Sequence, residues 1–352
     1  MTKSVSYNIR FRKKSVSEEI QAYKCRNQIK EGERNITLRQ MGGFMQTIQL
    51  RPVEPDPEIT DRISKDLQNA SDKQIHSFKL IRSKRDVHVY SCLYGEVPAV
   101  VKYFENEEDR REILNYRILI RSGIPTIRIL AFGGSALVME DLSQSEKWRL
   151  GVPEDLSDTD TAQCLAQWYF AFHEKGAAVS ELNTLYFEYD GITKKSLEML
   201  CARFPEASGI FMFILSRFDK LRNLIYEPSF TLTYNDFYWT NFAVRKDKQA
   251  AMMFDYNLLG KGYRFSDFRN VRSLAETAYQ AFLDEYERLY VKKHGHTRHE
   301  EERLEVKIDE VAAPLFSLIV ASRQEQFPEW AEYAKEEALD GTLADKAKRL
   351  LS

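Results

Sequence analysis

Three polar side chains in the second half of the chain have the types and spacing that phosphoryl transfer requires. Asp236 precedes Asn241 with four residues between them, and Asp255 follows after two more β-prone runs. Phosphoryl transfer uses one carboxylate beside the attacking hydroxyl, and an amide oxygen and a second carboxylate that hold Mg²⁺ against the nucleotide phosphates. An Asp-x4-Asn spacing by itself is a weak signal, because both residue types are common in turns.

A short hairpin is predicted to bring the three residues together. Apolar, β-prone runs lead toward Asp236, follow Asn241 and lead into Asp255, with the charged tip RKDKQ between the last two runs. Polar groups occur only where these runs begin or end, as in a strand–turn–strand unit. We therefore expect Asp236, Asn241 and Asp255 at one end of a hairpin.

Composition limits the class of protein. A length of 352 residues indicates about two domains or lobes, and the formal net charge of −2 argues against a general nucleic-acid binder. The four cysteines are scattered without a C-x-x-C pair, as in a reduced cytosolic protein. No apolar run approaches the roughly 20 residues of a membrane span. We expect a soluble cytoplasmic protein without membrane or nucleic-acid partners, and the oligomeric state stays open.

The segment 76–142 is predicted to form a small lobe with a β-sheet and one helix. Lys102 follows an apolar run in the third strand, where its side chain can reach nucleotide phosphates. In kinases a helix glutamate holds such a lysine. Glu112 adjoins the apolar face of the predicted helix, and Glu108, one turn earlier, is the competing candidate. The strands and the helix are SFKLIRS, DVHVYSCLYG, EVPAVVKYF, IPTIRILAFGG, SALVMEDLS and NEEDRREILNYRILIRSG.

The strand SALVMEDLS is predicted to lead into the crossing from the small lobe to the large lobe. Backbone groups there are expected to bind an adenine edge, and the residues are Met139, Glu140, Asp141 and Leu142. A mainly helical large lobe, 143–352, is expected to follow. One of its helices is expected to end near His173, and we interpret that histidine as structural. A single amphipathic helix is expected over 270–295, and a later helix is expected to be interrupted near Pro314. Residues 1–75 are a basic extension of unassigned role, with a strand pair about Gly42 and Gly43.

Together these residues resemble the aminoglycoside phosphotransferase and choline kinase family, which has a protein-kinase-like fold. The resemblance covers about 78–352. It rests on Lys102, Glu112, the helix end AFHEKG, the Asp236-to-Asn241 spacing, Asp255 in MFDY, and the later Asp267. It implies an α+β, two-lobed fold, with an antiparallel sheet plus a helix in the small lobe and a mainly helical large lobe.

The chain departs from the family pattern at three places. Tyr234 stands where the family has histidine, and Asn257 stands where many members carry a second acid, which puts a second metal in doubt. The phosphate-covering loop has no glycine and offers Ser83, Lys84 and Arg85 instead.

The resemblance implies an ATP-dependent phosphotransferase that transfers the γ-phosphate to a hydroxyl of a small molecule. Asp236 would be the catalytic base, Asn241 and Asp255 would bind Mg²⁺, and Lys102 would contact the phosphates, held by Glu112. Two alternatives remain. One is a catalytically silent nucleotide-binding regulator. The other is a protein kinase, which the absence of an Ala-Pro-Glu segment after Asp255 disfavours.

The acceptor is the least defined part of this hypothesis. The helix at 272–293 and the segments after 300 are expected to wall its site and are rich in acids, which favours a cationic amino sugar, aminoglycoside or amino alcohol. Tyr238 and Trp239 are placed to pack on a sugar face or a cationic head group. The acids are Asp284, Glu285, Glu287, Glu300, Glu301, Glu302, Asp309, Glu310, Glu325, Glu329 and Glu332.

Overall fold

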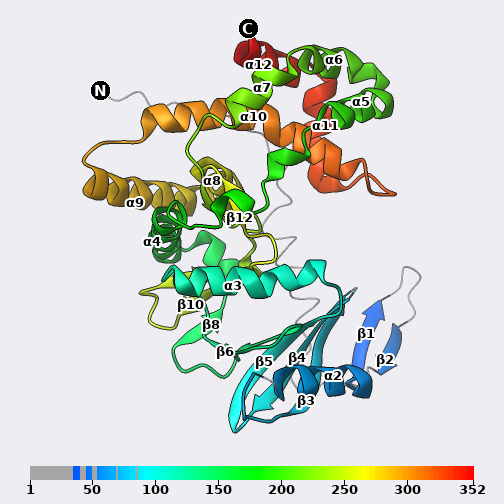
Figure 1. Cartoon of the computed structure of the whole chain (residues 1–352), viewed down its shortest axis with the longest axis vertical. Helices are drawn as coiled ribbons and strands as arrows, with labels where there is room; N and C mark the ends of the chain where they lie inside the picture. Colours follow the sequence, from blue (N-terminus) through cyan, green and yellow to red (C-terminus); the bar gives the residue numbers. More distant parts are fainter. Residues whose placement is uncertain (1–34, 40–44, 50–53, 69, 85) are drawn as a thin grey trace. The chain divides into compact units, whose positions relative to one another are not determined.

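A computed structural model describes residues 35–39, 45–49, 54–68, 70–84 and 86–352. The chain divides into two compact units (Figure 1). The first contains the described residues up to Glu105 together with Leu130–Asp141, and the second contains Asn106–Ile129 and Leu142–Ser352. The predicted turn at Gly42 and Gly43 lies outside the described residues, although the flanking strands β1 (Asn35–Arg39) and β2 (Met45–Gln49) pair antiparallel.

The first unit is built on a sheet of five strands in the order β3-β4-β5-β7-β6. Neighbouring strands from β3 to β7 pair antiparallel, so short hairpins suffice to connect β3, β4 and β5. Side chains along β4 alternate between half-buried and buried, which is the pattern of a strand with one face on a core. The strands are β3 (Ile75–Lys84), β4 (Val87–Tyr94), β5 (Val97–Phe104), β6 (Ile129–Phe132) and β7 (Ala136–Glu140).

Helix α2 (Pro57–Gln68) belongs to this unit, although it lies within the basic N-terminal extension. Its buried residues Ile59, Ile63 and Leu67 recur at helical spacing and join the core under the sheet. The Asp66 carboxylate accepts hydrogen bonds from the backbone N–H groups of residues 134, 135 and 136, at 3.0, 2.9 and 2.9 Å. The C-terminal part of the extension is therefore an integral layer of the first unit.

The second unit is mainly helical. Helices α4 and α9 lie side by side, and α10 packs against α5, α11 and α12 around one large apolar cluster. The Asp158 side chain caps α4 by accepting from the Thr161 N–H at 2.8 Å. The helices are α3 (Arg111–Arg121), α4 (Thr159–Gly176), α5 (Lys194–Arg203), α6 (Ser208–Ser216), α7 (Phe218–Ile225), α8 (Arg264–Val271), α9 (Glu276–His294), α10 (His299–Ala321), α11 (Glu332–Leu339) and α12 (Thr342–Leu351).

Two helix predictions are wrong. The expected single helix over 270–295 is interrupted, because α8 ends at Val271 and α9 begins only at Glu276. The Ala275 N–H between them donates to the Leu156 oxygen at 2.8 Å, so a tertiary contact replaces the helical hydrogen bond. The expected interruption near Pro314 does not occur, since α10 continues through that residue.

Two small sheets in the second unit flank the stretch that carries Asp236. Strands β9 (Thr231–Thr233) and β12 (Gly260–Gly262) pair antiparallel. Strand β10 (Phe242–Arg245) pairs antiparallel with both β11 (Ala251–Met253) and β8 (Trp148–Leu150). Among the described residues, no helix has the length and apolar character needed to cross a membrane.

Candidate active site

The β10–β11 hairpin brings together the three residues that the sequence analysis singled out. Beyond the last strand pair, the Phe254 N–H donates to the Asn241 oxygen at 2.9 Å, so Asn241 and Asp255 lie at the same end of the hairpin. The Asn241 amide nitrogen donates to both the backbone oxygen and Oδ2 of Asp236, each at 3.1 Å. All three side chains are half-buried, so they stay accessible while their positions are held by hydrogen bonds.

The backbone of this site is strained at two positions. Asn235 has a φ of 64° and Asp255 a φ of 63°, in the left-handed region that Asn and Asp tolerate better than most residues. The Asn235 side chain donates to the Leu258 oxygen at 3.1 Å, and the Asp255 N–H donates to the Tyr116 hydroxyl at 3.1 Å. Such strain persists where surrounding contacts enforce it, and it is frequent at functional sites.

Tyr234 connects the segment before Asp236 to the segment that carries Asp255. Its side chain is fully buried, and its hydroxyl donates to the Phe254 oxygen, with the Asp255 oxygen 3.3 Å away. Its ring also packs edge-on against Tyr256, with the centroids 5.6 Å apart. The residue noted in the sequence only as a departure from the family histidine therefore holds the segment before Asp236 to the segment that carries Asp255.

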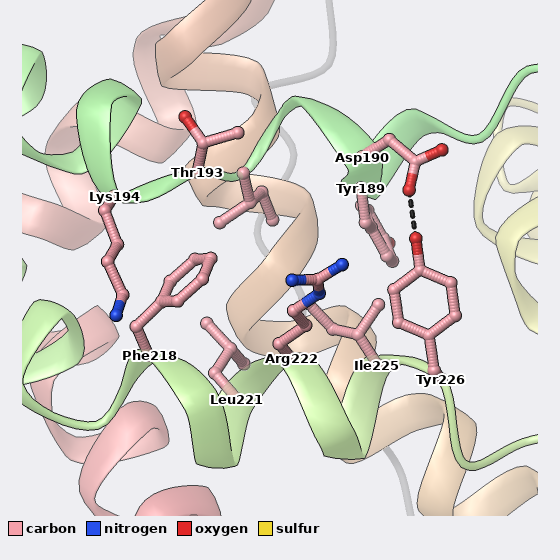
Figure 2. Close-up of a pocket in the computed structure, with 10 residues that line it drawn as sticks. Tyr189, Asp190, Thr193, Lys194, Phe218, Leu221, Arg222, Ile225 and Tyr226 are labelled. Atoms are coloured by element: carbon pink, nitrogen blue, oxygen red, sulfur yellow. Dashed lines mark hydrogen bonds between the residues drawn. The ribbon is translucent and has the colours of Figure 1, made fainter.

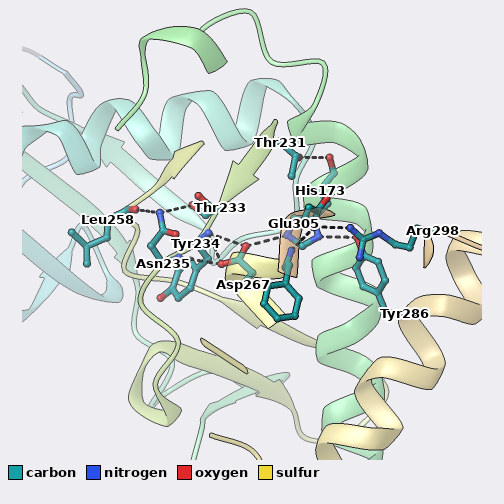
Figure 3. Close-up of polar contacts among 11 residues, drawn as sticks. His173, Thr231, Thr233, Tyr234, Asn235, Leu258, Asp267, Tyr286, Arg298 and Glu305 are labelled. Carbon is teal, nitrogen blue, oxygen red and sulfur yellow. Dashed lines mark hydrogen bonds and ion pairs between the residues drawn. The ribbon is translucent and has the colours of Figure 1, made fainter. Parts of the chain in front are cut away.

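A buried network of hydrogen bonds also supports the backbone at Tyr234 and Asn235 (Figure 3). Asp267 accepts from the backbone N–H groups of Tyr234 and Asn235, with its Oδ1 at 3.0 and 3.2 Å. His173 Nε2 lies 3.0 Å from Asp267 Oδ2, and its Nδ1 lies 2.8 Å from the Tyr286 hydroxyl. The His173 side chain is fully buried within this hydrogen-bond network, in keeping with the structural role expected for it.

Burial shifts the proton affinities of this pair in opposite directions. Desolvation raises the pKa of Asp267 to about 7, although the two backbone N–H groups act to lower it. Desolvation lowers the pKa of His173 well below its usual value, and the nearby charges of Arg264 and Arg298 lower it further. Below about pH 7 Asp267 is therefore protonated and His173 is neutral.

Helix α3 attaches to the same site through one face. The Asn115 side chain donates to the Tyr256 oxygen at 2.7 Å, next to the contact between Tyr116 and Asp255. Glu112 lies one turn before Tyr116 and is only 1% exposed, whereas the competing candidate Glu108 is exposed. Burial, and then the charge of Glu112, raise the pKa of Tyr116 well above its usual value.

The remaining predicted residues lie mostly in the first unit. Lys102 is in the central strand β5, opposite Val89 on one side and Leu137 on the other, and its Nζ lies 5.5 Å from the centroid of the Phe104 ring. Met139 and Glu140 belong to β7. Asp141 is the last residue of the first unit. The buried Leu142 begins the segment Leu142–Ser352 of the second unit.

The glycine-free segment proposed to cover phosphates is described only in part. Arg85 lies outside the described residues. The Ser83 hydroxyl and His88 Nδ1 lie 3.0 Å apart, and Lys84 is exposed at the end of β3.

Oxygen donors at the hairpin end fit a magnesium ion. Mg²⁺ prefers carboxylate and carbonyl oxygens, which Asp255 and the Oδ1 atom of Asn241 supply. Because the Asn241 nitrogen is bonded to Asp236, its amide oxygen is oriented away from that contact. Asn257 Oδ1 is buried, and no hydrogen bond to it is found in the described part of the chain, so it is a further oxygen that a metal would satisfy.

Some of the acids expected to wall the acceptor site are paired with bases. Glu285 contacts Arg288 at 2.7 Å, and Asp309 contacts Arg269 at 2.7 Å. Similar pairs are Glu300 with Arg303 and Glu332 with Lys335. By contrast, Tyr238 beside Asp236 is 44% exposed, and its ring centroid lies 5.7 Å from that of Trp239. Tyr238 is therefore an exposed aromatic side chain next to the half-buried Trp239.

Comparison with known proteins identifies the fold. No protein-family model and no curated protein sequence matches the chain. The crystal structure of a macrolide 2'-phosphotransferase from Brachybacterium faecium matches with a TM-score of 0.54 and 13% identity, over 81% of this chain and 98% of that one. An ethanolamine kinase from Plasmodium vivax matches with a TM-score of 0.50 and 11% identity, over 77% and 84%. The chain therefore has the α+β, protein-kinase-like fold of the aminoglycoside phosphotransferase and choline kinase family, as the resemblance in sequence predicted.

Proposed function

We propose that the chain is a phosphotransferase that moves the γ-phosphate of ATP to a hydroxyl of a small molecule. The observation that carries this proposal is the hairpin end, where Asn241 bonds to Asp236 and shares its end of the hairpin with Asp255. A base, an amide oxygen and a carboxylate in one place are what phosphoryl transfer needs. Structures with the same fold include a macrolide phosphotransferase and an ethanolamine kinase, which supports a small-molecule acceptor.

Each residue of the proposed site has a stated role. Asp236 accepts the proton of the acceptor hydroxyl and orients it for attack. Asn241 and Asp255 would hold Mg²⁺, with Asn257 as an additional oxygen donor, and the ion would neutralise charge on the phosphates. Lys102 contacts the α- and β-phosphates, and Glu112 keeps the supporting role that the resemblance in sequence implies for it. Positioning and charge stabilisation are the main contributions in such a reaction.

The nucleotide base is assigned to the end of β7 and the two residues that follow it. Backbone groups of residues 139–142, named in the sequence analysis, would bind the adenine edge. The acceptor is proposed to be cationic, an amino sugar, aminoglycoside or amino alcohol, because the exposed ring of Tyr238 and its neighbour Trp239 offer faces that bind cations. The proposed location is cytoplasmic.

Asp236→Asn tests the central role. The substitution is expected to leave Mg-ATP binding intact and to reduce turnover by orders of magnitude, because the amide cannot take the hydroxyl proton. Asp247→Asn is the matched control, since Asp247 is paired with Arg245 at the opposite, exposed end of the same hairpin. ATP consumption with aminoglycosides, choline-like alcohols, amino sugars and neutral nucleosides measures turnover, and a thermal shift with ATP and Mg²⁺ measures binding.

The same measurements separate the proposal from its alternatives. A silent nucleotide-binding regulator, which the glycine-free loop and Asn257 favour, would bind ATP without transfer to any acceptor. Radiolabel transfer to a protein and to no small hydroxyl compound would indicate a protein kinase. Turnover with neutral or anionic acceptors only would refute the cationic acceptor and leave the phosphotransferase proposal standing.

A further inference from the structure

A cavity of about 250 Å³ lies between residues 189–194 and helix α7 in the second unit (Figure 2). Much of its wall is apolar. Ile192, Leu221 and Ile225 are buried, and the half-buried ring of Phe218 also lines it. Apolar walls with a few polar groups are typical of small-molecule sites. None of the lining residues belongs to the set proposed for phosphoryl transfer, so the cavity requires its own explanation.

Positive charge in this cavity is only partly balanced. Figure 2 shows the Arg222 guanidinium pointing into the cavity, and within the described part of the chain it makes no ion pair or side-chain hydrogen bond. Asp190, the acid of the lining, accepts instead from the Tyr226 hydroxyl. Lys194 is the second cation, with its Nζ 3.5 Å from the exposed Asp219 and 5.5 Å from the Phe218 ring centroid. Because Asp219 balances Lys194, Arg222 is the lining cation for which the described part of the chain offers no ion pair.

We propose that this cavity binds a small amphiphilic anion, an aromatic or alkyl body that ends in one carboxylate or phosphate group. The anionic group pairs with Arg222, assisted by Lys194, and the body packs against Ile192, Leu221 and Ile225. A guanidinium binds carboxylate and phosphate oxygens through the same paired geometry. Because a cavity of roughly 150 Å³ holds benzene, the present one has room for an aryl ring that carries a single charged group.

The proposal can be tested on the full chain without nucleotide or acceptor, so it does not depend on the proposed function. Titrations followed by ligand-observed NMR use benzoate and phenyl phosphate as the two anionic probes. Benzyl alcohol and benzylamine are neutral and cationic controls of similar size. We expect saturable binding of at least one anion and much weaker binding of both controls, because they cannot pair with Arg222.

Matched variants locate the binding. Arg222→Gln is expected to weaken binding of the anion about tenfold, which is the effect of losing one charged hydrogen bond. Arg217→Gln removes the same charge just before α7 but outside the lining, and Lys195→Gln does so beside Lys194, so both are expected to leave affinity unchanged. Circular dichroism melting curves confirm that the variants fold. All three positions are exposed, so unfolding is not expected.

Three results would overturn the proposal. They are the absence of saturable anion binding at millimolar concentration, equal binding of benzylamine and benzoate, and equal weakening by Arg222→Gln and Arg217→Gln. Binding of one anion and not the other supports the site and identifies the charged group that it prefers.

Discussion

At the scale of single residues, the Tyr234 hydroxyl is the contact that joins the two loops of the proposed site. Tyr234→Phe keeps the buried ring but leaves the Phe254 oxygen without this donor. We expect a loss of about 1–3 kcal/mol in the free energy of unfolding, as for other buried groups left unsatisfied, and a lower kcat because the Asp255 segment is held less firmly. Urea unfolding and turnover measure the two effects.

Tyr238→Phe serves as the control for that substitution. Its hydroxyl belongs to an exposed residue of the same stretch, so stability is expected to change little. Equal stability of the Tyr234→Phe protein and the parent would show that the hydroxyl bond does not hold the two loops together.

Asp267 is expected to make stability depend on pH in a defined direction. Its folded pKa is raised from 3.8 to about 7, so the unfolded chain releases this proton at lower pH than the folded chain does. The contribution of Asp267 is therefore complete below about pH 4 and is lost as pH rises toward 7, by up to about 1.4 kcal/mol per pH unit. His173 stays neutral in the folded state and is common to both proteins in a comparison with Asp267→Asn.

The measurement is the difference in the free energy of unfolding between the parent and Asp267→Asn from pH 4 to pH 8. We expect this difference to change steadily in favour of the variant up to about pH 7 and then to become constant. A difference that does not vary with pH would mean that Asp267 is already ionised in the folded protein throughout this range.

At the scale of elements, the close approach of the segment around Tyr186 to β12 depends on a glycine. A Cβ atom on Gly260 would lie 2.4 Å from the Tyr186 backbone oxygen, and the Lys261 N–H donates to that same oxygen at 2.8 Å. Gly260→Ala is therefore expected to destabilise the protein by about 1–3 kcal/mol, the usual range for overpacking. The displaced strand pairs with β9, which leads to Asp236, so turnover should also fall.

Gly209→Ala in α6 provides the control. A Cβ atom there meets no other atom within 4 Å, so alanine is expected to stabilise the helix by up to about 1 kcal/mol. Thermal melts of both variants measure the effects. An unchanged stability of the Gly260→Ala protein would show that the Tyr186 segment and β12 can move apart without loss of stability.

At the scale of the whole second unit, Arg269 joins segments that are distant in sequence. It contacts Glu188 at 2.8 Å and Asp309 at 2.7 Å, and it donates to the Tyr189 hydroxyl at 2.9 Å. Exposure of the three charged side chains is 19, 16 and 5% for Arg269, Glu188 and Asp309. Removal of the base leaves the buried Asp309 and the half-buried Glu188 without their cation, so Arg269→Met is expected to cost about 3–5 kcal/mol.

Arg288→Met is the comparison for this prediction. Arg288 is 57% exposed and pairs with Glu285 on the same helix, and such surface pairs contribute only about 0–1 kcal/mol. Urea unfolding of the two variants gives both free energies. Similar losses in the free energy of unfolding would show that burial of the Arg269 ion pairs does not increase their contribution to stability.

Features that depend on residues close in sequence could be predicted from the sequence alone. Periodic apolar positions predicted the strands of the first unit and most helices, and the short interval from Asp236 to Asn241 predicted their meeting at one hairpin end. These predictions succeeded because a hairpin or a helical turn is set by a few neighbouring residues. The undivided helix over 270–295 was wrong because the Ala275 N–H bonds to Leu156, a residue far away in the chain.

Only the tertiary structure decided which distant groups support the proposed site. His173 and Asp267 are 94 residues apart, and the Tyr116 hydroxyl that accepts from the Asp255 N–H is 139 residues away. No local pattern distinguishes such a tyrosine from any other core aromatic. These partners meet because α3, α4 and α8 bury their apolar faces in one unit, and the polar groups buried with those faces must then find hydrogen-bond partners within it.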